Sequence, residues 1–182
     1  MQIFRCQLEG GFSRNIDKII ENIERLHDTG VVGINIEDSL KGNDGIKIQP
    51  ANVLQQIISA VTNHFEKKNI KMFINARTDG FVVKIPGALQ ETITRAKLYG
   101  DAGANGIFVP FLQEKGDIAA VVASTRLPVN VFALPALPGF SELAALGVKR
   151  ISMGTSVYNA AKRFLNHTIN TIVSEQSFSS LY

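Results

Sequence analysis

The sequence predicts an α/β fold of the (β/α)8 TIM-type barrel class. Three observations support this prediction. Short apolar segments alternate with longer segments of helical periodicity, a glycine precedes three of the apolar segments, and polar residues follow several of them. Such alternation indicates βαβ units and therefore a parallel sheet.

Six apolar segments are expected to be strands, and each is followed by an expected helix. The strands are 2–8, 32–36, 71–76, 106–109, 129–132 and 149–152. The helices are 14–29, 49–68, 87–102, 113–124, 139–146 and 154–174. The first helix carries apolar residues at helical spacing, which predicts one face packed on the sheet. These residues are Ile16, Ile19, Ile20, Ile23 and Leu26.

A weak internal repeat supports the strand–helix alternation. The segments TGVVGINI, AGANGIFV and LGVKRISM each place a glycine shortly before an apolar segment. Gly30, Gly103 and Gly147 are therefore expected to end a helix just before a strand, in the left-handed conformation that glycine adopts at low cost.

The number of units falls short of a closed barrel, which needs eight strands and about 250 residues. We therefore expect residues 1–182 to form a single domain, an incomplete barrel of about six βα units. A doubly wound open sheet is the alternative. The barrel is favoured because no GxGxxG motif follows a strand and polar residues gather at many strand ends rather than at one switch point.

Composition limits the classes of partner. The 19 basic and 16 acidic residues give a net charge of only +3, with no basic run typical of nucleic-acid binding. One cysteine, Cys6, excludes an intramolecular disulfide and suits a reducing compartment. No apolar run reaches the ~18 residues of a membrane span. We expect a cytoplasmic protein acting on a small molecule.

Polar residues at the carboxyl ends of the expected strands are the candidate site. Ligands of parallel α/β proteins bind beyond these ends. Glu37 and Asp38 follow one strand, and Arg77 ends the next. Side chains alternate along a strand, so an inward Glu37 predicts an inward Asn35, and an inward Arg77 predicts an inward Asn75.

Gln7 and Glu9 share one face of the first expected strand, so three neighbouring strands direct polar groups inward. Such groups are costly unless they bind each other, water or a ligand. A structural ion pair between Glu37 and Arg77 is one interpretation. The functional interpretation is a Mg²⁺ ion held by Glu9 and Glu37 through waters, with Arg77 binding a carboxylate. This arrangement suits an α-keto acid whose developing enolate the metal stabilises.

Four segments carry a family resemblance: GVVGINIEDS, INARTDG, RAKLYGDAGANGIFVP and LPALPGFSELAALGVKRISMGTSVYNAA. From about residue 3 to about residue 165 the sequence resembles the isocitrate lyase/phosphoenolpyruvate mutase superfamily. The resemblance implies a Mg²⁺-dependent barrel enzyme that cleaves or rearranges a bond next to an α-oxo carboxylate, through an enolate. It also implies homo-oligomers that exchange C-terminal helices.

The resemblance gives roles to individual residues. Glu37 matches the metal-site glutamate of the IED motif. Arg77 matches the carboxylate-binding arginine of the NAR motif and is the principal catalytic candidate. Asn75, in the same motif, is the second substrate-binding candidate.

The sequence departs from the family pattern at three places. The family's Asp-x-Asp appears as Gln7-Leu8-Glu9, so Glu9 and the neutral Gln7 are the remaining metal-ligand candidates. The gating loop, Ser39 to Lys47, is short and lacks the lyase pattern Lys-Lys-Cys-Gly-His, which disfavours isocitrate and methylisocitrate lyase activity.

Within that loop, Lys41 and Asn43 are either catalytic electrophiles or two solvated residues. The third departure is that the family's first two strands precede the first strand expected here. The barrel is therefore expected to be truncated at its N-terminus relative to the family, through a natural deletion, a misassigned start or a fragment.

Three functions follow as hypotheses. The first is a Mg²⁺-dependent lyase or mutase acting on a small α-oxo carboxylate or phosphonate. The second is a degenerate, non-catalytic homologue that serves as an oligomer subunit or remnant. The third is an unrelated phosphate-binding barrel, for which Gly154-Thr155-Ser156 before a helix is the candidate anion site.

Overall fold

A computed structural model describes residues 4–182 of the chain. The chain divides into two compact units, residues 1–151 and 152–182, with the boundary inside the last strand. Each unit is described by itself. Within the described residues no helix is both long and apolar enough to cross a membrane.

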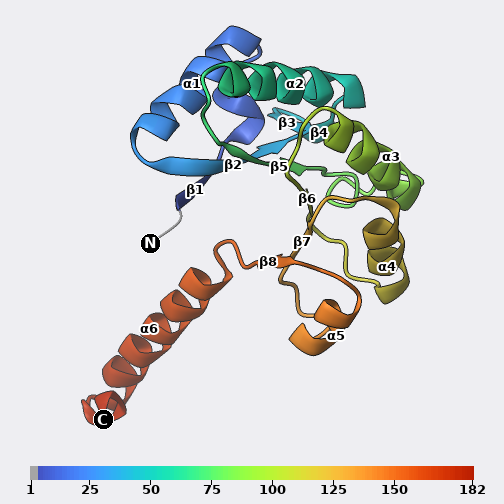
Figure 1. The fold of residues 1–182 in the computed structure, drawn as a ribbon. Helices are drawn as coiled ribbons and strands as arrows, with labels where there is room; N and C mark the ends of the chain where they lie inside the picture. The colour runs from blue at the N-terminus through green and yellow to red at the C-terminus, as the bar shows by residue number, and fades with distance from the viewer. Residues whose placement is uncertain (1–3) are drawn as a thin grey trace. The chain divides into compact units, whose positions relative to one another are not determined.

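The first unit is built on a curved parallel sheet, which confirms the predicted incomplete barrel (Figure 1). Its six strands lie in the order β1-β2-β5-β6-β7-β8, so the sheet begins and ends at β1 and β8. Their bounds are β1 Phe4–Gln7, β2 Val31–Glu37, β5 Phe73–Arg77, β6 Gly106–Val109, β7 Val129–Phe132 and β8 Arg150–Ser152.

Five helices of the first unit connect successive strands and line the outer face of the curved sheet (Figure 1). They are α1 Ile16–Asp28, α2 Ala51–Lys67, α3 Ala88–Asp101, α4 Lys115–Ser124 and α5 Phe140–Ala145. A short 3-10 turn, η1 Glu9–Phe12, joins β1 to α1. Each predicted helix of this unit is confirmed to within a few residues of its bounds.

The hydrophobic core lies between the sheet and these helices. Ile34 and Ile36 of β2 and Ile74 of β5 are at most 3% exposed and pack in one cluster with Ile19 and Ile23 of α1. Alternate strand residues therefore face the helices, and the remaining strand residues line the concave face of the sheet.

The three repeat glycines have the conformation predicted for them. Gly30, Gly103 and Gly147 have φ angles of +91°, +103° and +90°, in the left-handed region. Gly103 also fits closely, since an added Cβ would lie 2.7 Å from Thr62 Oγ1. These glycines end helices α1, α3 and α5 just before β2, β6 and β8.

The segment expected to be a short gating loop forms a β-hairpin. Strands β3 Ser39–Gly42 and β4 Gly45–Ile48 pair antiparallel around a two-residue turn. The sequence analysis assigned no strands here, although the segment has a hairpin signal: Leu40 precedes Asn43-Asp44, Ile46 and Ile48 alternate after it, and Gly45 has a φ of +103°.

The second unit is one long helix followed by a short turn. Helix α6 spans Ser156–Glu175, and the 3-10 turn η2 spans Ser179–Leu181. The predicted helix at 154–174 is confirmed. Tyr158, Leu165 and Ile169 recur at spacings of seven and four residues and share one face of this amphipathic helix.

Candidate active site

The register between β2 and β5 brings the predicted site residues together. Glu37 lies opposite Arg77, and Asn35 lies opposite Asn75. Because Ile34 and Ile36 are buried against the helices, these polar residues occupy the concave face. The predicted alternation is confirmed, and the Glu37–Arg77 pair stands at the carboxyl-terminal end of the strands.

Glu37 is half-buried and has two polar neighbours. Its Oε2 accepts a hydrogen bond from Gln7 Nε2 and lies 3.5 Å from the Arg77 guanidinium. Burial raises the pKa of Glu37 above its ordinary value, and Arg77 opposes this effect. The carboxylate is thus a poorly solvated charge that gains from a second cation.

Arg77 is held from one side, which leaves its other side open. Its Nε donates to Asp79 Oδ1 over 2.7 Å, and its guanidinium carbon lies 5.7 Å from the centre of the Phe108 ring. Asp79 therefore fixes the Nε end of the guanidinium, whereas among the described residues NH1 has only the longer contact with Glu37. An incoming carboxylate would meet the terminal nitrogens, which are the usual donors to such groups.

Asn75 lies two residues below Arg77 on the same face and is completely buried. Its Nδ2 donates to Asn35 Oδ1 over 2.8 Å, while its own Oδ1 has no hydrogen-bond partner among the described residues. Gly106 makes room for this oxygen, since a Cβ there would lie 2.8 Å from it. A buried oxygen without a protein partner commonly accepts a hydrogen bond from an ordered water or from a ligand.

Glu9 is exposed in η1, close enough for its charge to raise the pKa of Glu37 further. Glu37, Glu9 and Gln7 offer oxygen donors, and Gln7 already contacts Glu37. The described residues contain no group of three or more His, Cys, Asp or Glu that could hold a metal. These donors fit Mg²⁺ bound largely by waters and substrate rather than a closed protein cage.

Lys41 and Asn43, the two loop candidates, lie in the hairpin. Lys41 is in β3 and Asn43 is in the hairpin turn, and both are exposed. Neither side chain has a hydrogen-bond or ion-pair partner within residues 4–182. Their catalytic role stays a prediction.

Five further residues contact the site or each other; Asp38 was already a strand-end candidate in the sequence, whereas Arg95 and Tyr99 of α3 were not selected. Asp38 and Ser39 follow Glu37, Asp79 follows Arg77, and Arg95 and Tyr99 reach in from α3. One signal could have revealed the α3 residues: Thr92, Arg95, Ala96 and Tyr99 form a single buried helical face. An arginine on such a face needs a buried acidic partner.

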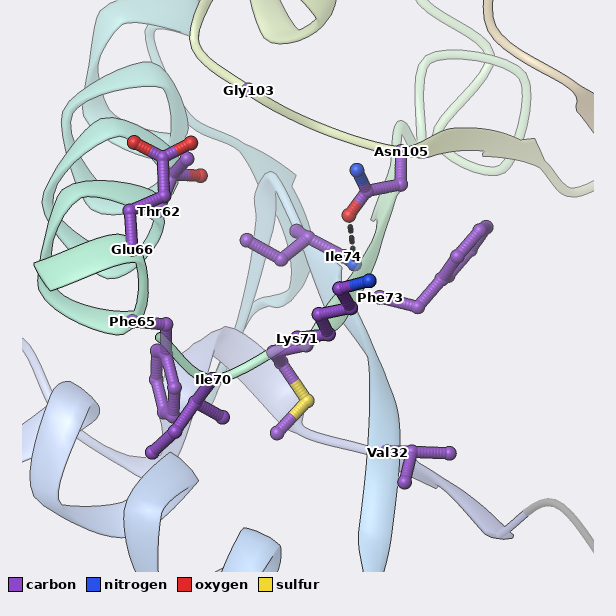
Figure 2. Close-up of a pocket in the computed structure, with 11 residues that line it drawn as sticks. Val32, Thr62, Phe65, Glu66, Ile70, Lys71, Phe73, Ile74, Gly103 and Asn105 are labelled. Carbon is purple, nitrogen blue, oxygen red and sulfur yellow. Dashed lines mark hydrogen bonds between the residues drawn. The ribbon is translucent and has the colours of Figure 1, made fainter. Parts of the chain in front are cut away.

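A cavity of about 450 Å³ lies elsewhere, at the amino-terminal ends of β2 and β5 (Figure 2). Thr62 and Glu66 of α2, Lys71 and Val32 are among its lining residues. In the same cavity Asn105 Oδ1 accepts a hydrogen bond from the Ile74 N–H over 2.9 Å. This cavity is at the opposite end of the strands from Glu37 and Arg77, the end that serves stability in parallel barrels.

Comparison with known sequences points to one family. The sequence model described as phosphoenolpyruvate phosphomutase matches residues 5–173. An uncharacterized protein of Mycobacterium tuberculosis is 32% identical over 165 residues, which cover 91% of this chain and 59% of the relative. An oxaloacetate decarboxylase of Ectopseudomonas mendocina is 27% identical, covering 83% of this chain and 51% of the relative.

A solved structure agrees with these relatives. A crystal structure from Burkholderia cenocepacia J2315, provisionally classed as a phosphonomutase, superposes with a TM-score of 0.84 at 32% identity. The match covers 93% of this chain and 71% of that protein. The chain spans between about half and three-fifths of the length of the two curated relatives above.

Proposed function

The chain belongs to the phosphoenolpyruvate phosphomutase family, within the superfamily of lyases and mutases that act on small carboxylates and phosphonates, and on this premise we propose a specific activity. We propose that it is a Mg²⁺-dependent lyase that acts on a small α-oxo dicarboxylate and breaks the bond between its distal carboxylate and the carbon adjacent to the carbonyl. Cleavage of this bond leaves an enolate, which is then protonated.

The observation that carries this proposal is the inward pair of Glu37 and Arg77 in register on adjacent strands. The two groups are 3.5 Å apart, too far for a tight ion pair, and each keeps part of its surface accessible. Carboxylate and guanidinium groups placed side by side at a strand-end rim can bind a cation and an anion at once. An α-oxo acid chelating a metal presents both.

In the proposed reaction, Arg77 binds the α-carboxylate of the substrate through its terminal nitrogens, while Asp79 keeps the guanidinium oriented. Glu37, with Glu9 and Gln7, would hold Mg²⁺ through waters. When bound, this metal supplies positive charge to the carbonyl and carboxylate oxygens. Asn75 offers its unpartnered Oδ1 to a water or hydroxyl deeper in the site.

Oxaloacetate is the favoured substrate type, because decarboxylases of this compound are among the curated relatives. The bond between the methylene carbon and the distal carboxylate breaks, and carbon dioxide leaves. The electron pair of that bond enters the enolate of pyruvate, which is then protonated on carbon. Lys41 and Asn43, carried by the hairpin, are the candidate groups for stabilising charge in this step.

Turnover with a small panel of substrates tests the proposal. The purified chain is incubated with oxaloacetate, 2-methylisocitrate or phosphonopyruvate, with Mg²⁺ or with EDTA, and the products are followed by NMR. We expect Mg²⁺-dependent pyruvate formation from oxaloacetate that Arg77→Ala abolishes. The matched control Arg126→Ala removes an exposed arginine and should keep full turnover. Unchanged turnover in Arg77→Ala would refute the role of Arg77.

One observation favours a second candidate function, that of a non-catalytic homologue. Gln7 occupies a position where the family has a carboxylate, and its amide donates to Glu37. The carboxylate is thereby satisfied in part without a metal. If the chain binds neither Mg²⁺ nor oxalate, a mimic of the enolate, this second function replaces the first.

We also propose that the protein is a homo-oligomer, as the resemblance implies. Helix α6 supplies an apolar stripe, in which Leu165 and Ile169 are more than half exposed. Light scattering tests this assembly: Leu165→Glu should dissociate it, whereas Asn170→Glu, which places the same charge outside the stripe, should not. Equal masses for both variants and the wild type would contradict the role of the stripe.

A further inference from the structure

Asp38 is a buried carboxylate with partners on every side. Its Oδ1 accepts the backbone N–H of Asp79 over 3.0 Å. Its Oδ2 accepts both Arg95 NH1 and the Tyr99 hydroxyl over 2.9 Å each. The residue is completely buried, and so is Tyr99, while Arg95 is 4% exposed. No ligand could reach this carboxylate without unfolding its surroundings.

The Arg95 guanidinium links three segments that are distant in sequence. NH1 contacts Asp38, NH2 donates to the carbonyl of Gln49 over 2.9 Å, and Nε donates to Glu91 on its own helix. Gln49 directly follows β4, and its N–H donates to the carbonyl of Asp38 over 2.8 Å. Arg95 therefore ties α3 to both ends of the hairpin.

The contacts of Asp38 continue to the open site through Asp79. The Asp38 N–H donates to the Arg77 carbonyl over 3.1 Å, and the Asp79 N–H returns to the Asp38 side chain. The Asp79 carboxylate then accepts Arg77 Nε and the Ser39 hydroxyl. A shift of Asp38 would thus move the guanidinium of Arg77 and the start of the hairpin together.

We propose that Arg95 and Tyr99 are positioning residues for the Glu37–Arg77 site. They hold Asp38, and through Asp38 and Asp79 they set the direction of the Arg77 guanidinium and the position of the hairpin that carries Lys41. This inference rests on the proposed function for its consequence in ligand binding, but not for its consequence in hairpin order.

A purely structural brace is the competing explanation, and energetics argue against it as the whole account. Buried ion pairs add little net stability relative to apolar packing of the same volume, because both charges lose their water. A cross-link that served stability alone could be apolar. The present one has directional bonds to the two backbone groups, of Asp79 and Gln49, that flank the site and the hairpin.

Three variants separate the explanations. Tyr99→Phe removes one hydroxyl and keeps the ring, and Arg95→Lys keeps the charge but cannot reach Asp38 and Gln49 with a planar fork. Thr92→Val is the control: it is isosteric, buried on the same face of α3, and its hydroxyl has no partner among the described residues.

Hydrogen exchange of the full chain is the first measurement. We expect Tyr99→Phe and Arg95→Lys to raise exchange in peptides covering the hairpin, residues 39–49, and the turn at 78–80, more strongly than in β6 and β7. A uniform rise across all strands would indicate lost global stability only and would overturn the proposal. Unchanged hairpin exchange would overturn it as well.

Oxalate affinity in the presence of Mg²⁺ is the second measurement, made where every variant is fully folded. We expect Tyr99→Phe to weaken oxalate binding by about tenfold, the effect of one hydrogen bond to a charged group acting through Arg77. In combination with Arg77→Lys the two losses should not add, because both act on one guanidinium. Additive losses would overturn the positioning role.

The two measurements also distinguish this inference from the proposed function. If the wild type gives no heat with oxalate and Mg²⁺, the proposed function fails. The positioning of the hairpin is then decided by exchange alone, with the outcomes given above. If the wild type binds oxalate and Tyr99→Phe binds it equally well, the proposed function stands and the positioning inference is refuted.

Discussion

Two acidic residues, adjacent in sequence, each pair with an arginine, yet their surroundings are opposite. Glu37 meets Arg77 over 3.5 Å at the rim, where both side chains keep some exposure. Asp38 meets Arg95 over 2.9 Å in the interior, with every oxygen satisfied. The outer pair, Glu37 and Arg77, can still form hydrogen bonds with a ligand. The inner pair, Asp38 and Arg95, cannot.

The difference follows from strand alternation. Glu37 ends β2 with its side chain on the concave face, so the next residue turns toward the helices and meets α3. One dipeptide therefore supplies both the proposed ligand-binding carboxylate, Glu37, and the carboxylate of the buried ion pair behind it, Asp38. Residue type alone does not separate a functional carboxylate from a structural one; its direction relative to the sheet does.

Breaking the inner pair should lower the free energy of unfolding more than the other changes described here. Asp38→Asn leaves Arg95 buried with a neutral partner, and loss of one member of a buried pair typically costs about 3–5 kcal/mol. Denaturant unfolding followed by circular dichroism measures this loss. A cost below about 1 kcal/mol, the range of surface pairs, would show that Asp38 is not the central brace.

Filling the space beside Asn75 should lower the free energy of unfolding by an intermediate amount. In Gly106→Ala the new methyl group would lie 2.8 Å from Asn75 Oδ1 and 3.2 Å from the Phe73 ring. Overpacking of this kind costs about 1–3 kcal/mol. It should also weaken oxalate binding, because Asn75 lies below Arg77 on the same strand. Gly116→Ala, where an added Cβ meets nothing within 4 Å, is the control.

Neutralising the outer carboxylate should have the smallest effect on stability, with the opposite sign. Burial raises the pKa of Glu37 above its ordinary value of 4.5, so the folded chain prefers the protonated group. Its contribution to stability is full below that value and is lost as pH rises through the higher folded pKa.

Glu37→Gln removes this titration. The stability of the variant relative to the wild type should therefore increase between acidic and neutral pH, even as Mg²⁺ binding is lost. Unfolding curves recorded at several pH values check the trend. A relative stability that falls toward neutral pH would mean that the ionised carboxylate is stabilised in the fold.

Much of the fold could be predicted because the apolar periodicity of a parallel sheet is local. The strand and helix pattern, the end-of-helix glycines and the inward direction of Glu37 and Arg77 all follow from short spacings. The hairpin at 39–48 has an equally local signal, but the sequence analysis treated the segment only as a short gating loop and assigned no strands to it.

The buried pair of Asp38 and Arg95 could not be predicted in the same way, because it depends on contacts between residues far apart in the sequence. Arg95 is 57 positions from Asp38, and although the buried face of α3 indicates that Arg95 needs an acidic partner, nothing nearby in the sequence shows that the partner is Asp38. The same holds for Gln7, whose bond to Glu37 depends on the pairing of β1 with β2. Spacing shows which face a residue occupies, whereas the sheet order shows which residues meet.

Calorimetric titration with oxalate is the most direct test of the claim that the outer pair binds and the inner pair braces. The wild type should bind oxalate only when Mg²⁺ is present, and Arg77→Ala should abolish the heat at a temperature where circular dichroism shows that the variant is fully folded. Equal oxalate binding by Arg77→Ala and the wild type would contradict the account, and so would oxalate binding of the same affinity with and without Mg²⁺.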